Sequence, residues 1–486
     1  MPRCPKVTGR KDKKIQYQEM TYRKFKADYL FNGREMAGKD SVLITSADGT
    51  VQSVVPVAEA GEGVEVYRGL LSPGFVNCHC HLELSHMKGV IPERTGLVDF
   101  LSAVIRRRGG GQVEGRAATR GGADGSVRGE VDGSVRREAQ GGAGGEAHPV
   151  DTGDQQDRVK EAILAGEREM LDGGIVAVGD ICNTADTLEA KRAGKLSYHN
   201  FIETMGFIEA GAPARFAHSK GVFDEFGEVF PGSNSIVPHA PYSVSPALFR
   251  LIADFPGNRL LTMHNQESRE ENVFFQSGKG DFLRLYQLLG LDVSFFRGTG
   301  ETSLRSCLPY FHKGQTMILV HNVVTGEEDL RAALGGADAG SGDAAGGMSG
   351  GAAGGMSGGR PDLFFCLCPN ANLYIGGLLP DVNRLVSRGC RIVVGTDSLA
   401  SNHRLSLLEE LKTLQLTFPR LGVTTLLQWA TVNGAGALQL DGALGSFGSG
   451  KRPGVVLLRG LEEGLGEDSQ PEDPRLTAGT TVSRLL

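Results

Sequence analysis

The stretch PGFVNCHCHLELSH, residues 73–86, places three histidines and two cysteines within a short segment. Its β-branched and aromatic residues predict a strand. Because side chains alternate along a strand, His79 and His81 point to one face, and Cys78 and Cys80 point to the other. The cysteine face is otherwise apolar, so we expect it to pack against helices. The stretch therefore predicts a His-x-His pair on a polar face and two thiols in the core.

The rest of the chain alternates short apolar runs with helical patterns. Each run is followed by a helical stretch or by a connection long enough to hold one, which is typical of an α/β chain folded as a (β/α)₈ TIM barrel. An open doubly wound sheet would need a Gly-rich phosphate loop after an early strand, and the sequence has none there. The runs that we expect to be strands cover residues 74–82, 175–181, 197–205, 235–243, 259–265, 316–322, 363–370 and 391–398.

Histidines and a carboxylate gather at the carboxyl ends of these runs. The chain has 11 histidines, and five of them lie at or near such an end. In a barrel these ends meet at one mouth, where active sites lie. Imidazole and carboxylate groups suit Zn²⁺ or Fe²⁺, so the pattern points to a metal site. The residues concerned are His79, His81, His239, His264, His321 and Asp397.

Glu267 follows His264 at the spacing His-x-x-Glu. A carboxylate on the loop just past a metal ligand is well placed to move protons during a reaction. The alternative is an ordinary loop glutamate that is solvated or paired with a cation.

Composition narrows the class of protein. A formal charge of -6 gives no basic surface for nucleic acid, and no run of apolar residues is long enough to cross a membrane. The basic amino terminus lacks the apolar region of a signal peptide. With 8 cysteines, the chain is too poor in them for a disulfide scaffold, which indicates a reducing cytoplasm. The sequence is compatible with assembly into a homo-oligomer.

We expect one barrel domain with two insertions, flanked by two terminal segments. Residues 73–436 form the barrel, interrupted by Gly-rich insertions at about 109–149 and 335–359 that bury too little apolar surface to order themselves. Residues 20–72 and 437–486 contain short strands with turns. We expect both ends of the chain to form one small β-sandwich domain together, an inference that rests partly on the resemblance described next.

Seven stretches, taken in chain order, resemble the deaminase and chlorohydrolase branch of the amidohydrolase superfamily. Together they span about residues 20–486, apart from the two insertions. The stretches are PGFVNCHCHLELSH, VPHAPYSVSPALF, MHNQESREE, ILVHNV, CPNANLYIGG, VVGTDSLASNHRLSLLEELK and LLQWATVNGAGALQLDGALGSFGSGKRPGVVLL. Each stretch is of modest specificity, but the ordered set is highly specific.

The resemblance implies a single metal ion, Zn²⁺ first and Fe²⁺ as the alternative. Dinuclear relatives need a carboxylated lysine on the fourth strand, and SIVPHAPYS has no lysine. The implied ligands are His79, His81, His264 and Asp397. Three catalytic residues are implied. Glu267 is the proton shuttle, His321 positions the attacking water and the substrate, and Asp397 accepts a proton from that water. The resemblance also implies that His239 contacts the substrate.

The activity implied is hydrolytic removal of ammonia from an amidine-like carbon of a purine-type or nucleoside-type heterocycle, a small-molecule substrate. The form HLELS resembles enzymes that deaminate 6-aminodeoxyfutalosine. Glu83 is then a candidate to bind ribose-type hydroxyls and Arg404 a candidate to bind a substrate carboxylate. The alternatives are that Glu83 and His86 brace the loop and that Arg404 is an ordinary surface residue.

Three other functions fit the same fold. The site could expel chloride from a triazine or open a cyclic amide, and an ammonia assay separates these reactions from deamination. A non-catalytic scaffold that retained the barrel is disfavoured, because the complete set of metal-binding and proton-transfer residues is present in the sequence.

Overall fold

The computed structural model describes residues 22–108, 152–335, 359–462 and 473–486. All eight expected strands are present in the described part, arranged as two sheets in the orders β10-β9-β8-β7 and β11-β12-β13-β14. Neighbouring strands within each sheet run parallel, which confirms the α/β class. The strands are β7 (Phe75–Cys80), β8 (Ile175–Cys182), β9 (Ser197–Thr204), β10 (Asn234–Pro238), β11 (Leu260–Asn265), β12 (Thr316–His321), β13 (Asp362–Leu367) and β14 (Ile392–Val394).

The two parallel sheets meet at both edges. At one edge, Cys80 at the end of β7 forms a parallel bridge with Asp397, just past β14. At the other edge, the backbone N–H of His264 in β11 donates to the carbonyl oxygen of His239, just past β10, at 2.9 Å. These contacts bring the carboxyl ends of strands from both sheets to one region.

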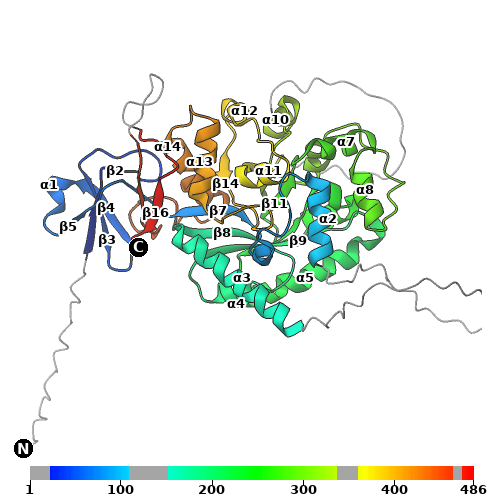
Figure 1. The fold of residues 1–486 in the computed structure, drawn as a ribbon, viewed down its shortest axis with the longest axis horizontal. Helices are drawn as coiled ribbons and strands as arrows, with labels where there is room; N and C mark the ends of the chain where they lie inside the picture. Colours follow the sequence, from blue (N-terminus) through cyan, green and yellow to red (C-terminus); the bar gives the residue numbers. More distant parts are fainter. Residues whose placement is uncertain (1–21, 109–151, 336–358, 463–472) are drawn as a thin grey trace, which may run out of the picture.

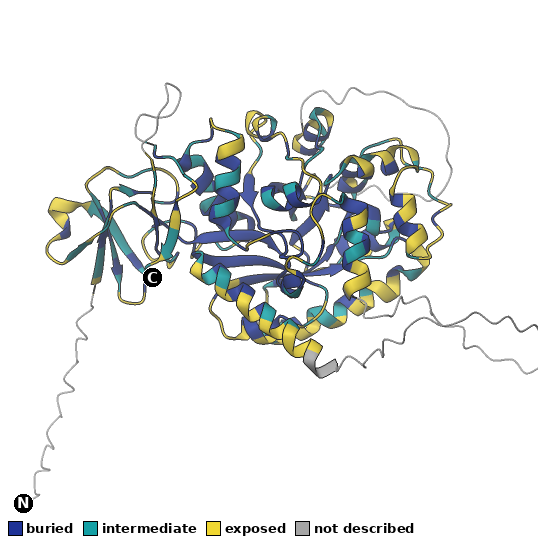
Figure 2. Cartoon of the chain, in the orientation of Figure 1, coloured by how far each residue is buried: buried dark blue, intermediate teal, exposed yellow. Residues whose placement is uncertain are grey.

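Helices follow the strands and cover their outer faces (Figure 1). The strands are buried while the outward faces of α3 and α5 are exposed (Figure 2). Because parallel strands are buried on both faces, their sequences are almost continuously apolar, as in IVAVGDIC of β8. The helices of this part are α2 (Leu97–Arg108), α3 (Thr152–Asp172), α4 (Leu188–Arg192), α5 (Ala212–Val229), α6 (Pro246–Ala253), α7 (Arg269–Ser277), α8 (Phe282–Leu288), α9 (Ser303–Cys307), α10 (Glu327–Leu334), α11 (Pro369–Ile375), α12 (Val382–Ser387), α13 (Leu407–Thr417), α14 (Val423–Ala430) and α15 (Val432–Ala437).

Two smaller sheets lie beside the parallel sheets (Figure 1). One has the order β4-β3-β1-β5, and the other, β16-β15-β6-β2, joins strands from both ends of the chain. An apolar cluster includes Phe25, Leu43 and Leu71 together with Val455 and Leu457, so both ends of the chain contribute to one core. The elements are β1 (Tyr22–Lys26), β2 (Tyr29–Leu30), β3 (Ser41–Ser46), β4 (Val51–Pro56), α1 (Val57–Ala60), β5 (Val64–Val66), β6 (Leu70–Ser72), β15 (Val456–Arg459) and β16 (Thr481–Arg484).

Several strands end earlier than the sequence predicts. β10 stops at Pro238 rather than at residue 243, and a 3₁₀ helix, η3 (Pro241–Ser243), follows it. β13 likewise stops before Pro369. Proline has no N–H to donate to a sheet, which explains both shortened ends.

β7 also ends early, at Cys80, and a 3₁₀ helix, η1 (Leu82–Met87), begins directly after His81. The insertion expected at 109–149 lies outside the described residues, and the one expected at 335–359 does so except for its two end residues. None of the described helices is long and apolar enough to cross a bilayer.

Candidate metal centre and active-site pocket

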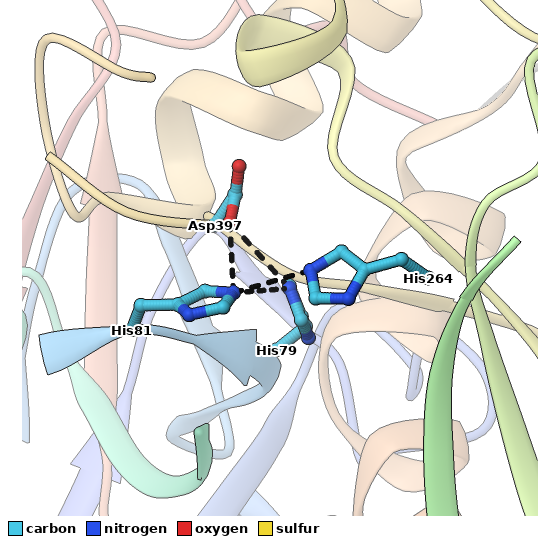
Figure 3. A group of neighbouring side chains, drawn as sticks. All are labelled: His79, His81, His264 and Asp397. Carbon is cyan, nitrogen blue, oxygen red and sulfur yellow. Dashed lines mark hydrogen bonds and ion pairs between the residues drawn. The ribbon is translucent and has the colours of Figure 1, made fainter. Parts of the chain in front are cut away.

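Four side chains converge where the carboxyl ends of the strands meet (Figure 3). His79 and His81 come from β7 and the residue after it, His264 from β11, and Asp397 from the segment after β14. All four are buried, and their candidate ligand atoms lie within 4.8 Å of one another. The structure thus brings together the four residues that the sequence predicts as metal ligands.

The distances between these donor atoms test whether the set fits one ion. His81 Nε2 lies 3.2 Å from Nε2 of His79, 3.2 Å from Nε2 of His264 and 3.4 Å from Oδ1 of Asp397. Tetrahedral ligands at zinc–nitrogen distance lie about 3.4 Å from one another. The donor set therefore fits a single ion of this size.

Hydrogen bonds outside the cluster set the orientation of two of these side chains. Nδ1 of His264 donates to the carbonyl oxygen of His239 at 2.8 Å, which leaves the lone pair of Nε2 directed at the cluster. Oδ2 of Asp397 accepts a hydrogen bond from Oγ of Ser401 at 2.6 Å, which leaves Oδ1 beside the imidazoles. Partners of this kind are typical of metal ligands.

The protonation states also suit a cation. Burial, followed by the proximity of His79 and His239, lowers the pKa of His264 to about 3, so its imidazole is neutral. Burial opposes ionisation of Asp397, but the hydrogen bond from His79 and the nearby imidazoles hold the pKa of Asp397 well below its ordinary value. Neutral imidazole and ionised carboxylate are the forms that bind metal ions.

Backbone strain is concentrated around this cluster. Asp397 has a φ of 56°, His321 a φ of 76° and Gln266 a φ of 47°, all in the left-handed region that non-glycine residues seldom adopt. Such conformations persist only where the surrounding structure enforces them, and they are frequent at functional sites. The strained residues immediately flank or belong to the candidate catalytic set.

Glu267 and His321 face each other beside the metal cluster. Oε1 of Glu267 lies 3.6 Å from Nε2 of His321. Nδ2 of Asn372 donates to Nδ1 of His321 at 2.9 Å, which places the proton of the neutral ring on Nε2. Burial, reinforced by Asp397 and Glu271, raises the pKa of Glu267 well above its ordinary value. The raised pKa favours the protonated form of Glu267, which is the form that a general acid needs.

The cluster opens into a cavity of about 830 Å³. His81, His239, His264, Glu267, His321 and Asp397 line its polar end. Helices α2 and α8 also line the cavity, with apolar side chains that include Phe100 and Leu285. A cavity of this size holds a substrate larger than a bare heterocycle.

The other predicted residues occupy different places. His239 lines the cavity, and its Nδ1 is 2.7 Å from Oγ of Ser243. Oε2 of Glu83 accepts hydrogen bonds from the backbone N–H of Asn183 at 2.9 Å and of Thr184 at 3.3 Å, which matches the bracing alternative.

Arg404 is exposed ahead of α13 and is not among the residues that line the cavity in the described structure. Its role as a substrate contact stays a prediction, as does that of Glu83. The cysteines lie in the core: Sγ of Cys78 is 3.8 Å from the carbonyl oxygen of Gly434 in α15, away from the metal cluster.

Sequence reasoning missed three polar residues of the site. Glu203 and Asn183 line the cavity, and Glu271 holds the loop that carries Glu267. Glu203 lies next to the end of β9, so the rule that found the histidines at strand ends could have found it. Asn183 follows β8 directly and satisfies the same rule.

Comparisons with known proteins agree on one family. The sequence model of the amidohydrolase family matches residues 70–473. Aminodeoxyfutalosine deaminase of Nitratiruptor sp. is 24% identical over 82% of this chain and 80% of its own length. Adenosine deaminase of Helicobacter pylori is 27% identical over 58% of this chain and 63% of its own length.

Solved structures share the fold. Helicobacter pylori aminofutalosine deaminase in complex with methylthio-coformycin superposes with a TM-score of 0.65 at 19% identity, covering 92% of this chain and 94% of that one. Atrazine chlorohydrolase TrzN from Arthrobacter aurescens, complexed with zinc, gives a TM-score of 0.61 at 18% identity, covering 89% and 86%. At these identities the structures establish the fold alone.

Proposed function

Because the chain belongs to the amidohydrolase family, we propose that it removes ammonia hydrolytically from an amidine-like carbon of a purine-type heterocycle. It is a hydrolase that acts on carbon–nitrogen bonds, and its family depends on a metal ion. The observation that carries the proposal is the convergence of His79, His81, His264 and Asp397 next to the buried side chain of Glu267, whose pKa burial raises.

We assign the metal site to these four ligands and propose Zn²⁺ as the native ion, with Fe²⁺ as the alternative. A bound ion of this kind supplies Lewis acidity, which makes an attacking water a better nucleophile near neutral pH. The separations of 3.2 to 3.4 Å between Nε2 of His81 and the other three donors suit an ion with tetrahedral coordination, such as zinc.

The protons are handled by residues around the metal ligands. Asp397, ionised and buried, accepts a proton from the attacking water through its carboxylate. Glu267 delivers its proton to the ring nitrogen beside the attacked carbon, which makes that carbon more electrophilic. Nε2–H of His321 donates a hydrogen bond to the oxygen on which charge develops. His239, whose ring centroid is 4.9 Å from that of His264, contacts the substrate from the cavity wall.

The proposed substrate is a nucleoside-type purine, with 6-aminodeoxyfutalosine among the candidates. By their names, the curated relatives include deaminases of aminodeoxyfutalosine, adenosine and 5-methylthioadenosine. This favours ammonia over chloride as the leaving group. The cavity of about 830 Å³, polar at the metal cluster and apolar along α2 and α8, suits a base that carries a bulky substituent.

For the architecture, we propose that the contacts at both edges of the parallel sheets close them into a (β/α)₈ barrel over residues 73–436. Residues 20–72 and 437–486 would form the composite β-sandwich, supported by the core that both ends of the chain share. We place the enzyme in the cytoplasm, since the cysteines of the described residues are unpaired thiols. Homo-oligomerisation is the partner interaction that we propose, and nucleic acid and membranes are not expected partners.

An ammonia-release screen tests the proposed reaction. The zinc-loaded protein is incubated with purine bases, nucleosides, aminodeoxyfutalosine and a chlorinated triazine, and the same panel is given to Glu267→Gln. We expect ammonia from at least one nucleoside and a loss of about 10²- to 10⁴-fold in turnover in the variant, because general acid–base catalysis contributes this much. Metal content should stay unchanged. Chloride release from a triazine without any deamination would overturn the proposal, and near-normal turnover by Glu267→Gln would remove Glu267 from the mechanism.

A further inference from the structure

Glu203, near the end of β9, is a buried carboxylate that the mechanism above does not use. Its side chain is 2% exposed and lines the substrate cavity. Oε2 accepts a hydrogen bond from Nδ2 of Asn183 at 3.1 Å. Oε1 has no hydrogen-bond partner among the described residues. A buried acceptor without a hydrogen bond lowers the stability of the folded protein. A ligand in the cavity that donates a hydrogen bond to this oxygen would remove that cost.

Orienting the metal ligand His264 does not account for Glu203. Oε1 lies 3.7 Å from Nδ1 of His264, beyond hydrogen-bonding distance. That nitrogen already donates to the carbonyl oxygen of His239 at 2.8 Å. For the same reason, Nδ1 of His264 has no free lone pair to offer a second metal ion in the grouping with Glu203 and His239.

The orientation of Glu203 is enforced by two residues from other loops. Oε2 of Glu83 accepts the backbone N–H of Asn183 at 2.9 Å and that of Thr184 at 3.3 Å. Asn183, held in this way, donates from Nδ2 to Oε2 of Glu203. The relay Glu83–Asn183–Glu203 therefore directs Oε1 in advance of ligand binding, as a recognition group requires.

The position of Oε1 identifies the part of the substrate that it meets. It lies next to Nδ1 of His264, whereas Nε2 of the same ring belongs to the metal cluster. One imidazole ring thus separates Oε1 from the point where the reacting carbon must lie. A carboxylate accepts hydrogen bonds and cannot donate them, so its partner carries O–H or N–H groups. On a purine nucleoside held by its amino-bearing carbon, the sugar supplies such hydroxyls.

We propose that Glu203 determines substrate specificity by accepting hydrogen bonds from the hydroxyl groups of a sugar attached to the heterocycle. The inference rests on the proposed deaminase function and deepens it. The sequence suggests Glu83 for this role. In the structure Glu83 accepts the backbone N–H groups of Asn183 and Thr184, so under this proposal it supports the relay and Glu203 is the residue that meets the sugar. The enzyme then discriminates nucleosides from analogues that lack these hydroxyls.

The test compares adenosine with 2′,3′-dideoxyadenosine on the zinc-loaded wild type and on Glu203→Gln. In the wild type, we expect kcat/KM to be about 10- to 100-fold higher for adenosine, the effect of a hydrogen bond to a charged acceptor. Glu203→Gln should lose most of this preference, with little change on the dideoxy analogue and no change in metal content. Glu209→Gln is the control, because Glu209 is exposed and forms an ion pair with the equally exposed Arg250 at 3.8 Å.

Different outcomes separate the two proposals. An equal loss on both nucleosides, or a loss of bound zinc, would make Glu203 a structural residue and overturn the specificity role while leaving the deaminase function intact. The specificity role would also be overturned, and the deaminase function left intact, if the wild type discriminated the two nucleosides no better than Glu203→Gln does. If the zinc-loaded wild type releases ammonia from neither nucleoside, and from nothing else in the screen described above, the deaminase function fails and the specificity role fails with it.

Discussion

The carboxylate of Glu271 accepts a hydrogen bond from the backbone N–H of Glu267 at 3.2 Å and thereby ties the proton-shuttle loop to helix α7. Its other oxygen accepts the N–H of Gln266 at 3.0 Å, the residue whose φ of 47° turns the loop. Nε2 of Gln266 in turn donates to Asp329 at 3.0 Å. Glu267 therefore sits on a loop that is locked from two helices.

We predict that Glu271→Gln lowers kcat by about 10- to 100-fold, because the amide NH₂ would face a backbone N–H and displace the loop. KM and bound metal should change little, since the variant contacts neither substrate nor ligands. Steady-state kinetics and metal analysis measure this. Glu270→Gln, one residue away and exposed, is the matched control. Unchanged kcat in Glu271→Gln would show that the loop keeps its conformation without this carboxylate.

Metal content should depend on the histidines and not on the neighbouring thiols. His264→Ala removes one of four ligands, so we expect its zinc content to fall well below one equivalent after dialysis. Cys78→Ser and Cys80→Ser should each retain about one equivalent, because both thiols are buried and alternation along the strand turns them from the face that carries His79 and His81. Elemental analysis of the purified proteins measures the zinc content. Zinc loss in the serine variants, with the fold intact by circular dichroism, would contradict the assignment of the metal to the histidines and not to the thiols.

His199 should make stability fall in acid. Burial lowers the pKa of His199 from 6.5 to about 3, and its Nε2 lies 2.8 Å from Oγ of Ser235. Below pH 6.5, His199 therefore binds a proton in the unfolded chain but stays neutral in the folded chain. Its contribution to the free energy of unfolding is lost as pH falls from 6.5 towards 3. Between about pH 7.5 and about pH 5.5 this histidine accounts for a loss of about 1.4 kcal/mol.

Chemical unfolding of the wild type and of His199→Gln at these two pH values measures this contribution. The variant should lose about 1.4 kcal/mol less than the wild type over the interval, whatever its stability at the higher pH. Equal losses would mean that His199 is protonated in the folded protein.

A buried ion pair supports the strand that carries the first ligands. Nζ of Lys191 is 2.6 Å from Oδ2 of Asp180, and neither side chain has exposed area. Oδ1 of Asp180 accepts the backbone N–H of Leu82, directly after His81. We predict that Lys191→Met destabilises the protein by about 3–5 kcal/mol, because it leaves a buried charge unpaired.

Unfolding by denaturant measures this loss, and the double variant Lys191→Met with Asp180→Asn should recover part of it, since it removes the unpaired charge. A single variant as stable as the wild type would mean that Asp180 is neutral or solvated in the folded protein.

Much of the fold and the metal site followed from local rules. Strand alternation placed His79 and His81 on one face, and the position of His264 and Asp397 at strand ends predicted their convergence; the structure shows all four together. The eight strands were recognisable because buried parallel strands are continuous apolar runs. The strand ends differ from the expectation: Pro238 and Pro369 limit β10 and β13, and β7 and β14 also stop early.

The sequence by itself determined which residues could bind a metal and shuttle protons, because those choices depend on residue type and on position along a strand. The tertiary structure alone decided which side chains hold the functional residues in place. Glu271 accepts a hydrogen bond from the backbone of Glu267, Asn372 donates one to His321, and Asn183 donates one to Glu203. Such partners come from loops and helices with no regular spacing in the chain. Their role follows from hydrogen-bond geometry between buried groups, which exists only once the sheets and helices have packed.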